Sequence, residues 1–369
     1  MTGVLALVTD AFGAYGGIAQ YNRDILSALA GNPDLTEIIA APRIGEPDNA
    51  IPAGLIQLKP IQSRARYALS ALKITLTRRP KIIFSGHLYH GPLAARLAKL
   101  TGARLISQLH GTEIWGPIAP HHLSPLDQSD LVLCVSKDTQ ARYRAATSQQ
   151  TDTTLVVPNT VGESFTPGDR DQARQRFNLD GEFAILTVGR LDARQGGYKG
   201  HEKIIRALPS LSIDGRDVVY LIAGKGDDED RLVTLVEELG LSEQVRFLGK
   251  VPAGDLPDLY RAADLFALPS TGEGFGIVYL EAMASGTPAI GLDVGGAIDA
   301  LQGLGTLTNI ENFPTMLGQA AAEATAMTYA DRLALAAETR RRFGHATFRA
   351  KINEALTRLD NRQPGSKAA

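Results

Sequence analysis

Two carboxylates, Glu273 and Glu281, stand eight residues apart in the stretch Ser270–Pro288 and are the first candidates for binding or chemistry. Glu273 lies in a glycine-rich turn, whereas Glu281 lies inside the apolar run Ile277–Ala284, which predicts a helix that Ser285–Pro288 ends. Outward-facing amides at a helix N-terminus suit an anion, and a carboxylate further along can accept hydrogen bonds from ribose hydroxyls. The alternative for Glu281 is a single charge on the rim of an amphipathic helix.

The whole nineteen-residue pattern resembles the Glu-x7-Glu signature of retaining glycosyltransferases with the GT-B fold, in family 4 of the usual classification. The resemblance implies that Glu273 binds hydroxyls of the donor sugar and that Glu281 binds the ribose of a nucleotide-diphosphate sugar. The backbone of the intervening loop would contribute further donor contacts, from Gly274, Phe275, Gly276 and Ile277.

Two cations follow the predicted strand Ala184–Val188, in the pairs Gly189-Arg190 and Lys199-Gly200. These pairs resemble the Gly-Arg and Lys-Gly segment of the same family, in which the two cations bind the donor diphosphate. Breaking a sugar–phosphate bond develops negative charge on the leaving diphosphate, and fixed cations stabilise that charge most in the transition state. The alternative is a pair of surface cations on a strand-to-helix loop.

Three further segments of this half match the family less closely. Gly224-Lys225-Gly226 lacks the spacing of a phosphate-binding Walker loop and is predicted to be a tight turn. The resemblance implies that main-chain groups around Lys250 and Val251 bind the nucleotide base, without indicating which base. Asp299 stands where the family usually has a glutamate after a glycine pair, which shortens the reach of that carboxylate.

The first half offers fewer chemical candidates. Gly16 and Gly17 follow the first predicted strand and resemble the family's N-terminal glycine loop, which passes close to the diphosphate; glycine allows such an approach because it has no Cβ. His110 follows the strand Leu105–Leu109, where the family often has a histidine that contacts the donor sugar or the acceptor. His87 and His90 are interpreted as loop histidines, and the sequence leaves the role of Glu113 open.

Charge is unevenly distributed in this half, because the window Asn49–Thr112 contains no Asp or Glu. The same window holds ten cations: Lys59, Arg64, Arg66, Lys73, Arg78, Arg79, Lys81, Arg96, Lys99 and Arg104. Within it, Ser63–Thr77 has an amphipathic pattern. Such a segment can lie on an anionic membrane surface, with each cation contributing about 1 kcal/mol. We therefore expect residues 59–81 to contact a membrane, with a solvated helix or a site for acceptor phosphate as alternatives.

Composition indicates an ordinary globular protein of 369 residues with a net charge of −2 and 44% hydrophobic residues, which gives no indication of nucleic-acid binding. The single cysteine, Cys134, lies in an apolar run and is expected to be buried. Residues 1–9 lack the basic start of a signal peptide, and no apolar stretch approaches the roughly 20 residues that span a bilayer. We expect a cytoplasmic protein that can also bind peripherally to the inner face of the membrane.

Short apolar strands alternate with helical patterns along the chain, which predicts parallel sheets covered by helices. The predicted strands are Val4–Val8, Ile38–Ala41, Ile82–Phe84, Leu105–Leu109, Leu131–Val135, Leu155–Val157, Ala184–Val188, Val218–Ala223, Val245–Phe247, Leu265–Leu268 and Ala289–Leu292. Eleven strands are too many for one ordinary sheet. We therefore predict an α/β protein of GT-B type, with two Rossmann-like parallel-sheet domains facing across a cleft.

The predicted domains are an acceptor-binding domain (1–160) and a donor-binding domain (161–330). A helical segment (331–361), broken near Gly344, would cross back to the first domain, and a flexible tail (362–369) would follow.

The resemblance implies a retaining hexosyltransferase that uses a UDP- or GDP-sugar and a lipid-linked or saccharide acceptor, in a pathway to cell-surface polysaccharide or glycolipid. No metal or other cofactor is expected, because the Asp-x-Asp motifs at Asp169–Asp171 and Asp228–Asp230 are interpreted as solvated surface acids. The alternatives are a GT-B sugar-nucleotide epimerase and a non-catalytic nucleotide-sugar-binding subunit. A dehydrogenase is disfavoured because no Gly-x-Gly-x-x-Gly opens a strand–helix–strand unit.

Overall fold

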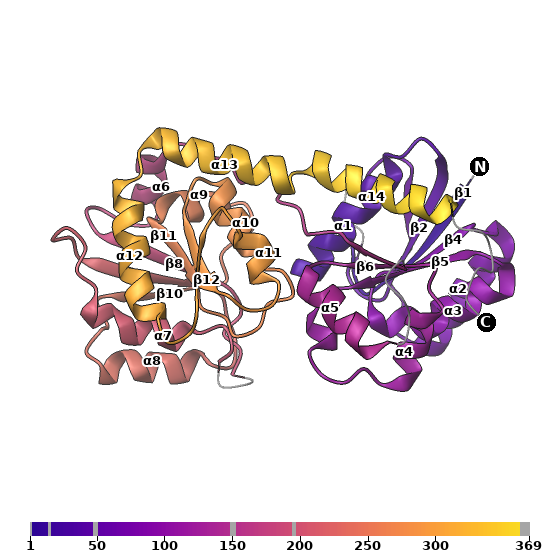
Figure 1. The fold of residues 1–369 in the computed structure, drawn as a ribbon, viewed down its shortest axis with the longest axis horizontal. Helices are drawn as coiled ribbons and strands as arrows, with labels where there is room; N and C mark the ends of the chain where they lie inside the picture. The colour runs from indigo at the N-terminus through magenta and orange to yellow at the C-terminus, as the bar shows by residue number, and fades with distance from the viewer. Residues whose placement is uncertain (1, 14–15, 47–50, 148–152, 194–196, 362–369) are drawn as a thin grey trace. The chain divides into compact units, whose positions relative to one another are not determined.

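The computed structural model describes residues 2–13, 16–46, 51–147, 153–193 and 197–361. The chain forms two compact units, shown in Figure 1. Unit 1 comprises Met1–Thr160 and His345–Ala369, and unit 2 comprises Val161–Gly344. The segment predicted at 331–361 is therefore divided between the units at Gly344, and the tail predicted at 362–369 lies outside the described residues.

Unit 1 is built on a sheet in which all neighbouring strands are parallel, in the order β3-β2-β1-β4-β5-β6-β7. Its strands are β1 (Thr2–Val8), β2 (Leu35–Pro42), β3 (Leu55–Gln57), β4 (Ile82–Ser85), β5 (Arg104–Leu109), β6 (Leu131–Cys134) and β7 (Thr154–Val156). In the register, Leu5 of β1 lies opposite Ile39 of β2 and Ile83 of β4. Both faces of the central strands are buried, which explains their continuous apolar sequences.

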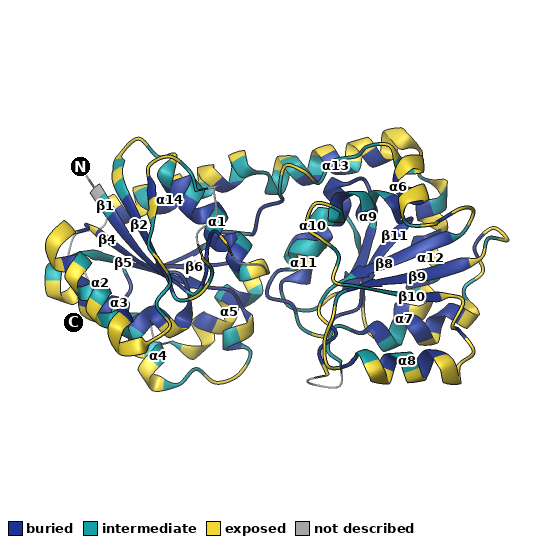
Figure 2. Cartoon of the chain, turned by 180° about the vertical axis from the view of Figure 1, so that it is seen from behind, coloured by how far each residue is buried: buried dark blue, intermediate teal, exposed yellow. Residues whose placement is uncertain are grey.

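The helices of unit 1 are α1 (Gly17–Ala30), α2 (Arg64–Arg78), α3 (Gly91–Thr101), α4 (Pro120–Asp127), α5 (Lys137–Ala146) and α14 (His345–Asp360). Two hydrophobic clusters join α2, α3, α4 and α5 to one face of the sheet, whereas α1 and α14 cover the other (Figures 1 and 2). Strand residues alternate between these faces: Leu5 and Leu7 pack beneath α2 and α3, and Val4 faces α1.

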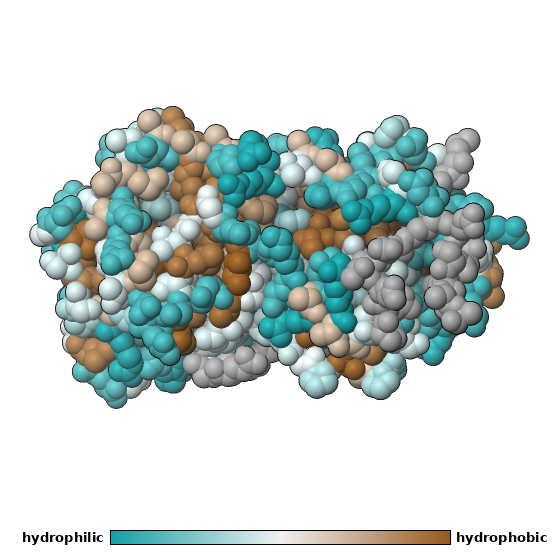
Figure 3. Space-filling view, viewed as in Figure 1, coloured by the Kyte–Doolittle hydropathy of each residue, from teal (hydrophilic) through white to brown (hydrophobic). Residues whose placement is uncertain are grey.

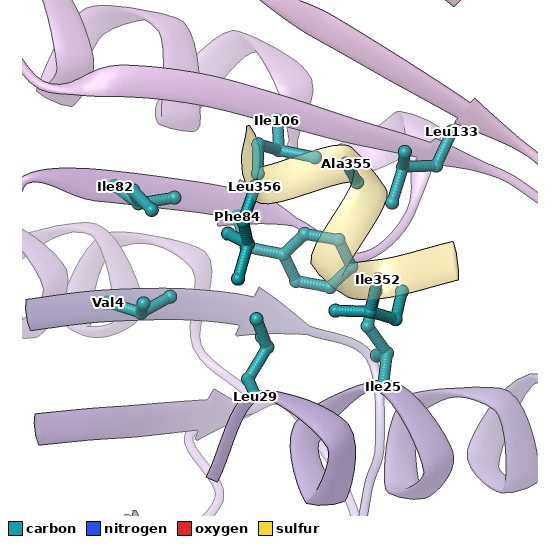
Figure 4. Close-up of a pocket in the computed structure, with 10 residues that line it drawn as sticks. All are labelled: Val4, Ile25, Leu29, Ile82, Phe84, Ile106, Leu133, Ile352, Ala355 and Leu356. Atoms are coloured by element: carbon teal, nitrogen blue, oxygen red, sulfur yellow. The ribbon is translucent and has the colours of Figure 1, made fainter. Parts of the chain in front are cut away.

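The C-terminal helix α14 is part of the core of unit 1. Its residues Ile352, Ala355 and Leu356 meet strand side chains such as Phe84, and they surround a cavity of about 10 Å³ (Figure 4). An apolar space of this size holds at most about one water and offers it no polar partner. The interface between α14 and the sheet is therefore closely packed, so α14 contributes to the stability of unit 1.

Unit 2 is built on a second parallel sheet, in the order β10-β9-β8-β11-β12-β13. Its strands are β8 (Phe183–Val188), β9 (Val218–Ala223), β10 (Val245–Gly249), β11 (Leu265–Leu268), β12 (Ala289–Leu292) and β13 (Thr306–Thr308). Its helices are α6 (Arg170–Arg176), α7 (His201–Ala207), α8 (Glu229–Glu238), α9 (Leu256–Ala262), α10 (Ile277–Ala284), α11 (Ala297–Leu301), α12 (Phe313–Ala326) and α13 (Tyr329–Phe343). Helices α7, α8 and α12 share one hydrophobic cluster with the sheet, and α9 and α10 pack on Phe266 on the other face.

The eleven predicted strands are all present, and the predicted α/β class with two parallel sheets is confirmed. Two further strands, β3 and β13, were not predicted. Both contain three residues, lie at a sheet edge and mix apolar with polar residues, so they leave no buried run in the sequence.

Candidate active site

The loops after β8 and β11 are joined by their backbones at the carboxyl edge of the second sheet. The N–H of Thr271 donates to the carbonyl of Tyr198 over 2.8 Å. Gly200 has φ +79°, and a Cβ at this position would lie 2.3 Å from the carbonyl oxygen of Pro269. Only glycine allows this approach, and it brings Lys199 next to the loop that carries Glu273.

Lys199 and Glu273 form an ion pair, with 2.5 Å between Nζ and Oε1. Their side chains are 15% and 9% exposed, so the pair is largely removed from water. Burial opposes the charge on Lys199, but the neighbouring Glu273 carboxylate outweighs it and raises the pKa of the ammonium group. The Lys199 ammonium group is therefore charged at neutral pH, and its Nζ also lies 5.1 Å from the ring centroid of Tyr198.

Gly295 and Gly296 pack against the backbone of the loop that carries Glu273. The N–H of Gly296 donates to the carbonyl of Glu273 over 2.8 Å. A Cβ on Gly295 would lie 2.6 Å from that same carbonyl oxygen, and one on Gly296 would lie 2.1 Å from the carbonyl oxygen of Gly274. The glycine pair therefore fixes the backbone of the loop from which the Glu273 side chain extends.

Arg190 follows β8 and differs from Lys199 in being exposed. Its side chain makes no hydrogen bond or ion pair with the residues described. Its loop is nevertheless ordered by the backbone, because the N–H of Gly189 donates to Ala223 and that of Leu191 donates to Lys225. Arg190 is thus a guanidinium on a fixed loop that is open to an anion.

The segment Gly224–Gly226, which follows β9, lies directly against the Arg190 loop. A Cβ at Gly224 would lie 1.8 Å from the carbonyl oxygen of Gly189, and one at Gly226 would lie 1.7 Å from that of Leu191. The N–H of Gly224 also donates to Gly249, which precedes Lys250 and Val251. The residues assigned as a turn are Asp227 and Asp228, just after the segment predicted to be a tight turn. Gly224–Gly226 connects the predicted diphosphate and base segments along one sheet edge.

The predicted helix Ile277–Ala284 corresponds exactly in its bounds to α10, and Gly276 precedes it with φ +92°. Phe275 is buried and packs edge-on against Phe343 of α13, which anchors the loop before the helix. Glu281 lies half-buried on α10 and accepts a hydrogen bond of 2.7 Å from the hydroxyl of Tyr260 on α9. Burial raises its pKa to about 7, although the Tyr260 bond acts in the opposite direction.

A buried polar chain lies beneath the Lys199 loop. Thr187 donates to the carbonyl of Ala267, so the hydroxyl of Tyr220 must donate to Thr187 and accept from Nδ1–H of His201. Burial, with Lys199 nearby, lowers the pKa of His201 to about 4. His201 is therefore neutral and held in one tautomer, and it begins α7 two residues after Lys199.

Unit 1 presents its predicted residues at the carboxyl edge of its own sheet. Gly16 is the N-cap of α1 with φ +104°, and Gly17 begins the helix. A Cβ on either glycine would have no heavy atom within 4 Å, so the backbone here is open to a ligand. Ala14 and Tyr15 of the same loop lie outside the described residues.

His110 is buried and follows β5, as predicted. Its Nε2–H donates to the carbonyl of Gly86 over 2.9 Å, and its backbone N–H donates to Glu113 over 2.6 Å. Burial lowers its pKa to about 4, although the Gly86 bond favours the charged form. His110 is therefore a neutral imidazole with one N–H already engaged.

The interpretation of His87 and His90 as loop histidines is incomplete, because both are buried. His87 stacks on His110 with 5.8 Å between ring centroids, and burial lowers the pKa of His87 to about 4 and that of His90 to about 3. Because burial disfavours the charged form, both imidazoles are neutral at neutral pH.

The interpretation of both Asp-x-Asp motifs as solvated acids is wrong for Asp228, which is buried. Arg231 donates to both of its carboxylate oxygens, over 2.7 and 2.9 Å. Asp169 instead caps α6 by accepting from the N–H of Gln172. Among the described residues, no three His, Cys, Asp or Glu side chains are arranged to hold a metal ion.

The predicted site residues thus form two groups. Unit 2 brings Arg190, Lys199, Glu273 and Glu281 to one sheet edge, together with the loops at Gly274–Ile277 and Lys250–Val251, whereas Gly16, Gly17 and His110 lie in unit 1. The sequence did not reveal Tyr198, Tyr260 or Tyr220. Tyr198 adjoins Lys199 and could have been noticed, but the other two act on partners distant in the chain.

Comparison with known proteins identifies the class. Two parallel-sheet units of this kind define the GT-B fold, and the chain superimposes on solved GT-B structures over nearly its full length. HepE of Anabaena, solved in complex with UDP, has a TM-score of 0.77 at 22% identity, covering 97% of this chain and 100% of that one. Sucrose-phosphate synthase of Thermosynechococcus elongatus has a TM-score of 0.74 at 20% identity, covering 98% and 99%.

The sequence identifies the family. Residues 15–164 match Glycosyltransferase Family 4, and residues 169–324 match Glycosyl transferases group 1. The chain is 32% identical over 263 residues to the GDP-mannose-dependent alpha-(1-6)-phosphatidylinositol monomannoside mannosyltransferase of Mycolicibacterium smegmatis, covering 66% of this chain and 67% of the relative. The chain therefore belongs to the family 4 glycosyltransferases.

Other relatives match over shorter stretches. The chain is 41% identical over 148 residues to a D-inositol 3-phosphate glycosyltransferase of Mycobacterium sp., which is 38% of this chain and 32% of that relative. The match to the mannosyltransferase of Mycobacterium tuberculosis covers 57% of its length. The chain thus spans between about a third and two thirds of these relatives.

In the described part of the chain, every helix is too short or too polar to cross a bilayer. On the face that Figure 3 presents, hydrophilic side chains interrupt the apolar patches.

Proposed function

We propose that this glycosyltransferase moves a hexose from a UDP- or GDP-sugar to a lipid-linked or saccharide acceptor, with retention of configuration at the sugar. The observation that supports this most is the charged pair Lys199–Glu273 beside the open guanidinium of Arg190, at one sheet edge of unit 2. An ammonium and a guanidinium suit a diphosphate, and a carboxylate suits sugar hydroxyls.

In the proposed reaction, Arg190 and Lys199 bind the diphosphate and stabilise the charge that develops as the sugar departs. Glu273 and the amides of Gly274–Ile277 bind sugar hydroxyls, and Glu281 binds the ribose. The acceptor hydroxyl attacks on the face from which the phosphate leaves. The bond from the anomeric carbon to the phosphate oxygen breaks, the bond to the acceptor oxygen forms, and the leaving phosphate takes the acceptor proton.

The neutral state of His110 fits this scheme. With a pKa near 4 and Nε2–H engaged by Gly86, His110 can position a substrate but carries no charge at neutral pH. We propose that it contacts the donor sugar or the acceptor, and that Gly16 and Gly17 allow the backbone of unit 1 to approach the diphosphate. No metal or other cofactor is proposed, because two cations already supply the charge.

The names of relatives support the choice of donor and acceptor. The mannosyltransferase of Mycolicibacterium smegmatis is GDP-mannose-dependent and acts on a phosphatidylinositol monomannoside, and HepE was solved with UDP. We therefore propose a UDP- or GDP-hexose as donor and place the reaction in the synthesis of cell-surface polysaccharide or glycolipid.

We also propose that unit 1 binds the inner face of the membrane through residues 59–81. Helix α2 buries Tyr67, Ala71 and Thr75, and it turns a stripe of alternating cations and leucines outward: Arg66, Leu69, Lys73 and Leu76. Leu69 and Leu76 are 66% and 52% exposed. Such a stripe combines attraction to anionic lipid with apolar insertion.

The test is thermal shift with UDP- and GDP-sugars, followed by turnover assays of Lys199→Ala and Glu273→Ala. We expect one nucleotide class to raise the melting temperature of the wild type, because a ligand bound only by the folded state stabilises it. Both variants should remain folded and lose donor turnover. Near-wild-type rates in both would refute these site assignments, and conversion of the donor sugar without any acceptor would favour an epimerase.

A further inference from the structure

A groove of about 440 Å³ runs between α3 and α4 on the outer face of unit 1. Its floor is apolar and is formed by Pro92, Ala95 and Pro125. The two helices pack closely beside it, since a Cβ on Gly91 would lie 3.2 Å from Cβ of Pro125. The groove belongs to the helix layer that also contains α2, as Figure 1 shows, and not to the sheet edge that carries His110.

The walls of this groove carry positive and neutral polar groups. Helix α3 contributes Arg96 and Lys99, α4 contributes His121 and Ser124, and Gln128 follows α4 as its C-cap, so no lining residue is acidic. Arg96 and Lys99 are exposed, and neither forms an ion pair or hydrogen bond with the described residues. Two uncompensated cations over a small apolar floor favour an anion that carries a compact apolar part.

The other cations of the window do not all share this property. Arg78 is paired with Glu37 over 3.3 Å, and Arg104 is paired with Asp130 over 3.1 Å. Pairing of this kind reduces the attraction that a cation can exert on a ligand. Arg96 and Lys99 differ because no described residue pairs with them and because they lie on one wall of a concave surface.

We propose that the α3–α4 groove binds the phosphate headgroup of an anionic membrane lipid. The source of the phosphate is indicated by the neighbouring surface, where Leu100 of α3 is 59% exposed and Leu69 and Leu76 of α2 are also exposed. Exposed leucines beside cations match a bilayer, in which phosphates lie next to acyl chains. The proposal rests on the proposed membrane association and assigns it a specific headgroup site.

The test is co-sedimentation of the full-length protein with phosphatidylcholine vesicles and with mixed phosphatidylcholine–phosphatidylglycerol vesicles. The groove variant is Arg96→Gln/Lys99→Gln. Its control is Arg349→Gln/Arg358→Gln on α14, which removes the same net charge from the opposite face of the sheet. Because Arg358 is paired with Glu354 over 2.7 Å, the comparison matched for pairing is Arg96→Gln against Arg349→Gln. We expect the groove variant to bind mixed vesicles roughly 30-fold more weakly than the wild type, at about 1 kcal/mol per cation. The control should change binding by less than about threefold.

A second variant, Ser124→Trp, fills the groove without changing its charge and should also weaken binding to mixed vesicles. Equal losses of vesicle binding in the groove variant and the α14 control would overturn the proposal. They would indicate that the net charge of the protein attracts it to the membrane, wherever the cations lie. Wild-type binding by Ser124→Trp would also overturn it, as would absence of wild-type binding to mixed vesicles. Tight binding of soluble glycerol phosphate that the groove variant abolishes would identify a free phosphate as the ligand and exclude the lipid.

Nucleotide binding separates this proposal from the function on which it rests. All variants should keep the wild-type thermal shift with the nucleotide-sugar, because the groove residues lie in unit 1, away from Lys199 and Glu273. A wild type without any nucleotide-dependent shift would refute the proposed function, whereas loss of lipid selectivity alone would refute only the groove.

Discussion

The two units place their charges differently. Unit 2 concentrates charge at the carboxyl edge of its sheet, where Arg190, Lys199 and Glu273 are held by backbone packing. Unit 1 has neutral, buried histidines at the corresponding edge, His87 and His110, and carries its cations on the outer helices. The difference agrees with the proposal that unit 2 binds the anionic leaving group and that the edge of unit 1 contacts neutral hydroxyl-rich groups.

The largest effect is expected from a double-mutant cycle on the Lys199–Glu273 pair. Lys199→Met or Glu273→Gln alone leaves one largely buried charge without its partner and should destabilise unit 2 by about 3 kcal/mol. The double variant should lower the free energy of unfolding of unit 2 by clearly less than the sum of the two single variants. Hydrogen exchange in peptides from 183–292 measures this locally, and simple additivity would show that the two groups do not interact.

A similar effect is expected in unit 1 from Ile352→Ala on α14, which enlarges the small cavity against the sheet. Truncating a buried isoleucine typically costs about 2–5 kcal/mol. The single tryptophan, Trp115, lies in unit 1, so its fluorescence during urea unfolding reports this unit alone. An unchanged Trp115 transition would mean that α14 does not stabilise unit 1.

A smaller effect is expected from Tyr220→Phe, which removes the hydroxyl between His201 and Thr187. Two buried bonds are lost, so unit 2 should lose about 1–3 kcal/mol. The matched control is Tyr279→Phe, whose buried hydroxyl makes one bond, to the carbonyl of Leu268. Calorimetry should show a larger loss of stability for Tyr220→Phe than for Tyr279→Phe. Equal losses would contradict a continuous series of hydrogen bonds from His201 through Tyr220 to Thr187.

The smallest effect concerns the pH dependence of Glu281. Its pKa near 7 exceeds the ordinary value, so folding favours its protonated form and the fold loses stability as pH rises toward 7. If ribose hydroxyls bind the carboxylate, nucleotide-sugar affinity should instead rise several-fold between about pH 6 and 8, as Glu281 ionises. Calorimetric titration of Glu281→Gln should give a flat profile, and a flat wild-type profile would exclude Glu281 from the ribose site.

The local sequence predicted the helices and strands better than it predicted the side-chain contacts of the candidate site. The bounds of α10 followed from the glycine before it and the Ser-Gly-Thr-Pro stop after it, and strands buried on both faces left long apolar runs. The 2.5 Å pairing of Lys199 with Glu273 joins positions 74 residues apart, and no local pattern encodes it. The burial of Asp228 was missed for a different reason: its partner Arg231 is only three residues away, but its run of neighbouring acids resembles an exposed turn.

The most direct measurement is a crystal structure of the protein with UDP or GDP bound. The expected result is a diphosphate in contact with Arg190 and Lys199 at the carboxyl edge of the second sheet, with the ribose on Glu281. A nucleotide bound elsewhere, with both cations free of phosphate, would contradict the assignment of unit 2 as the donor site.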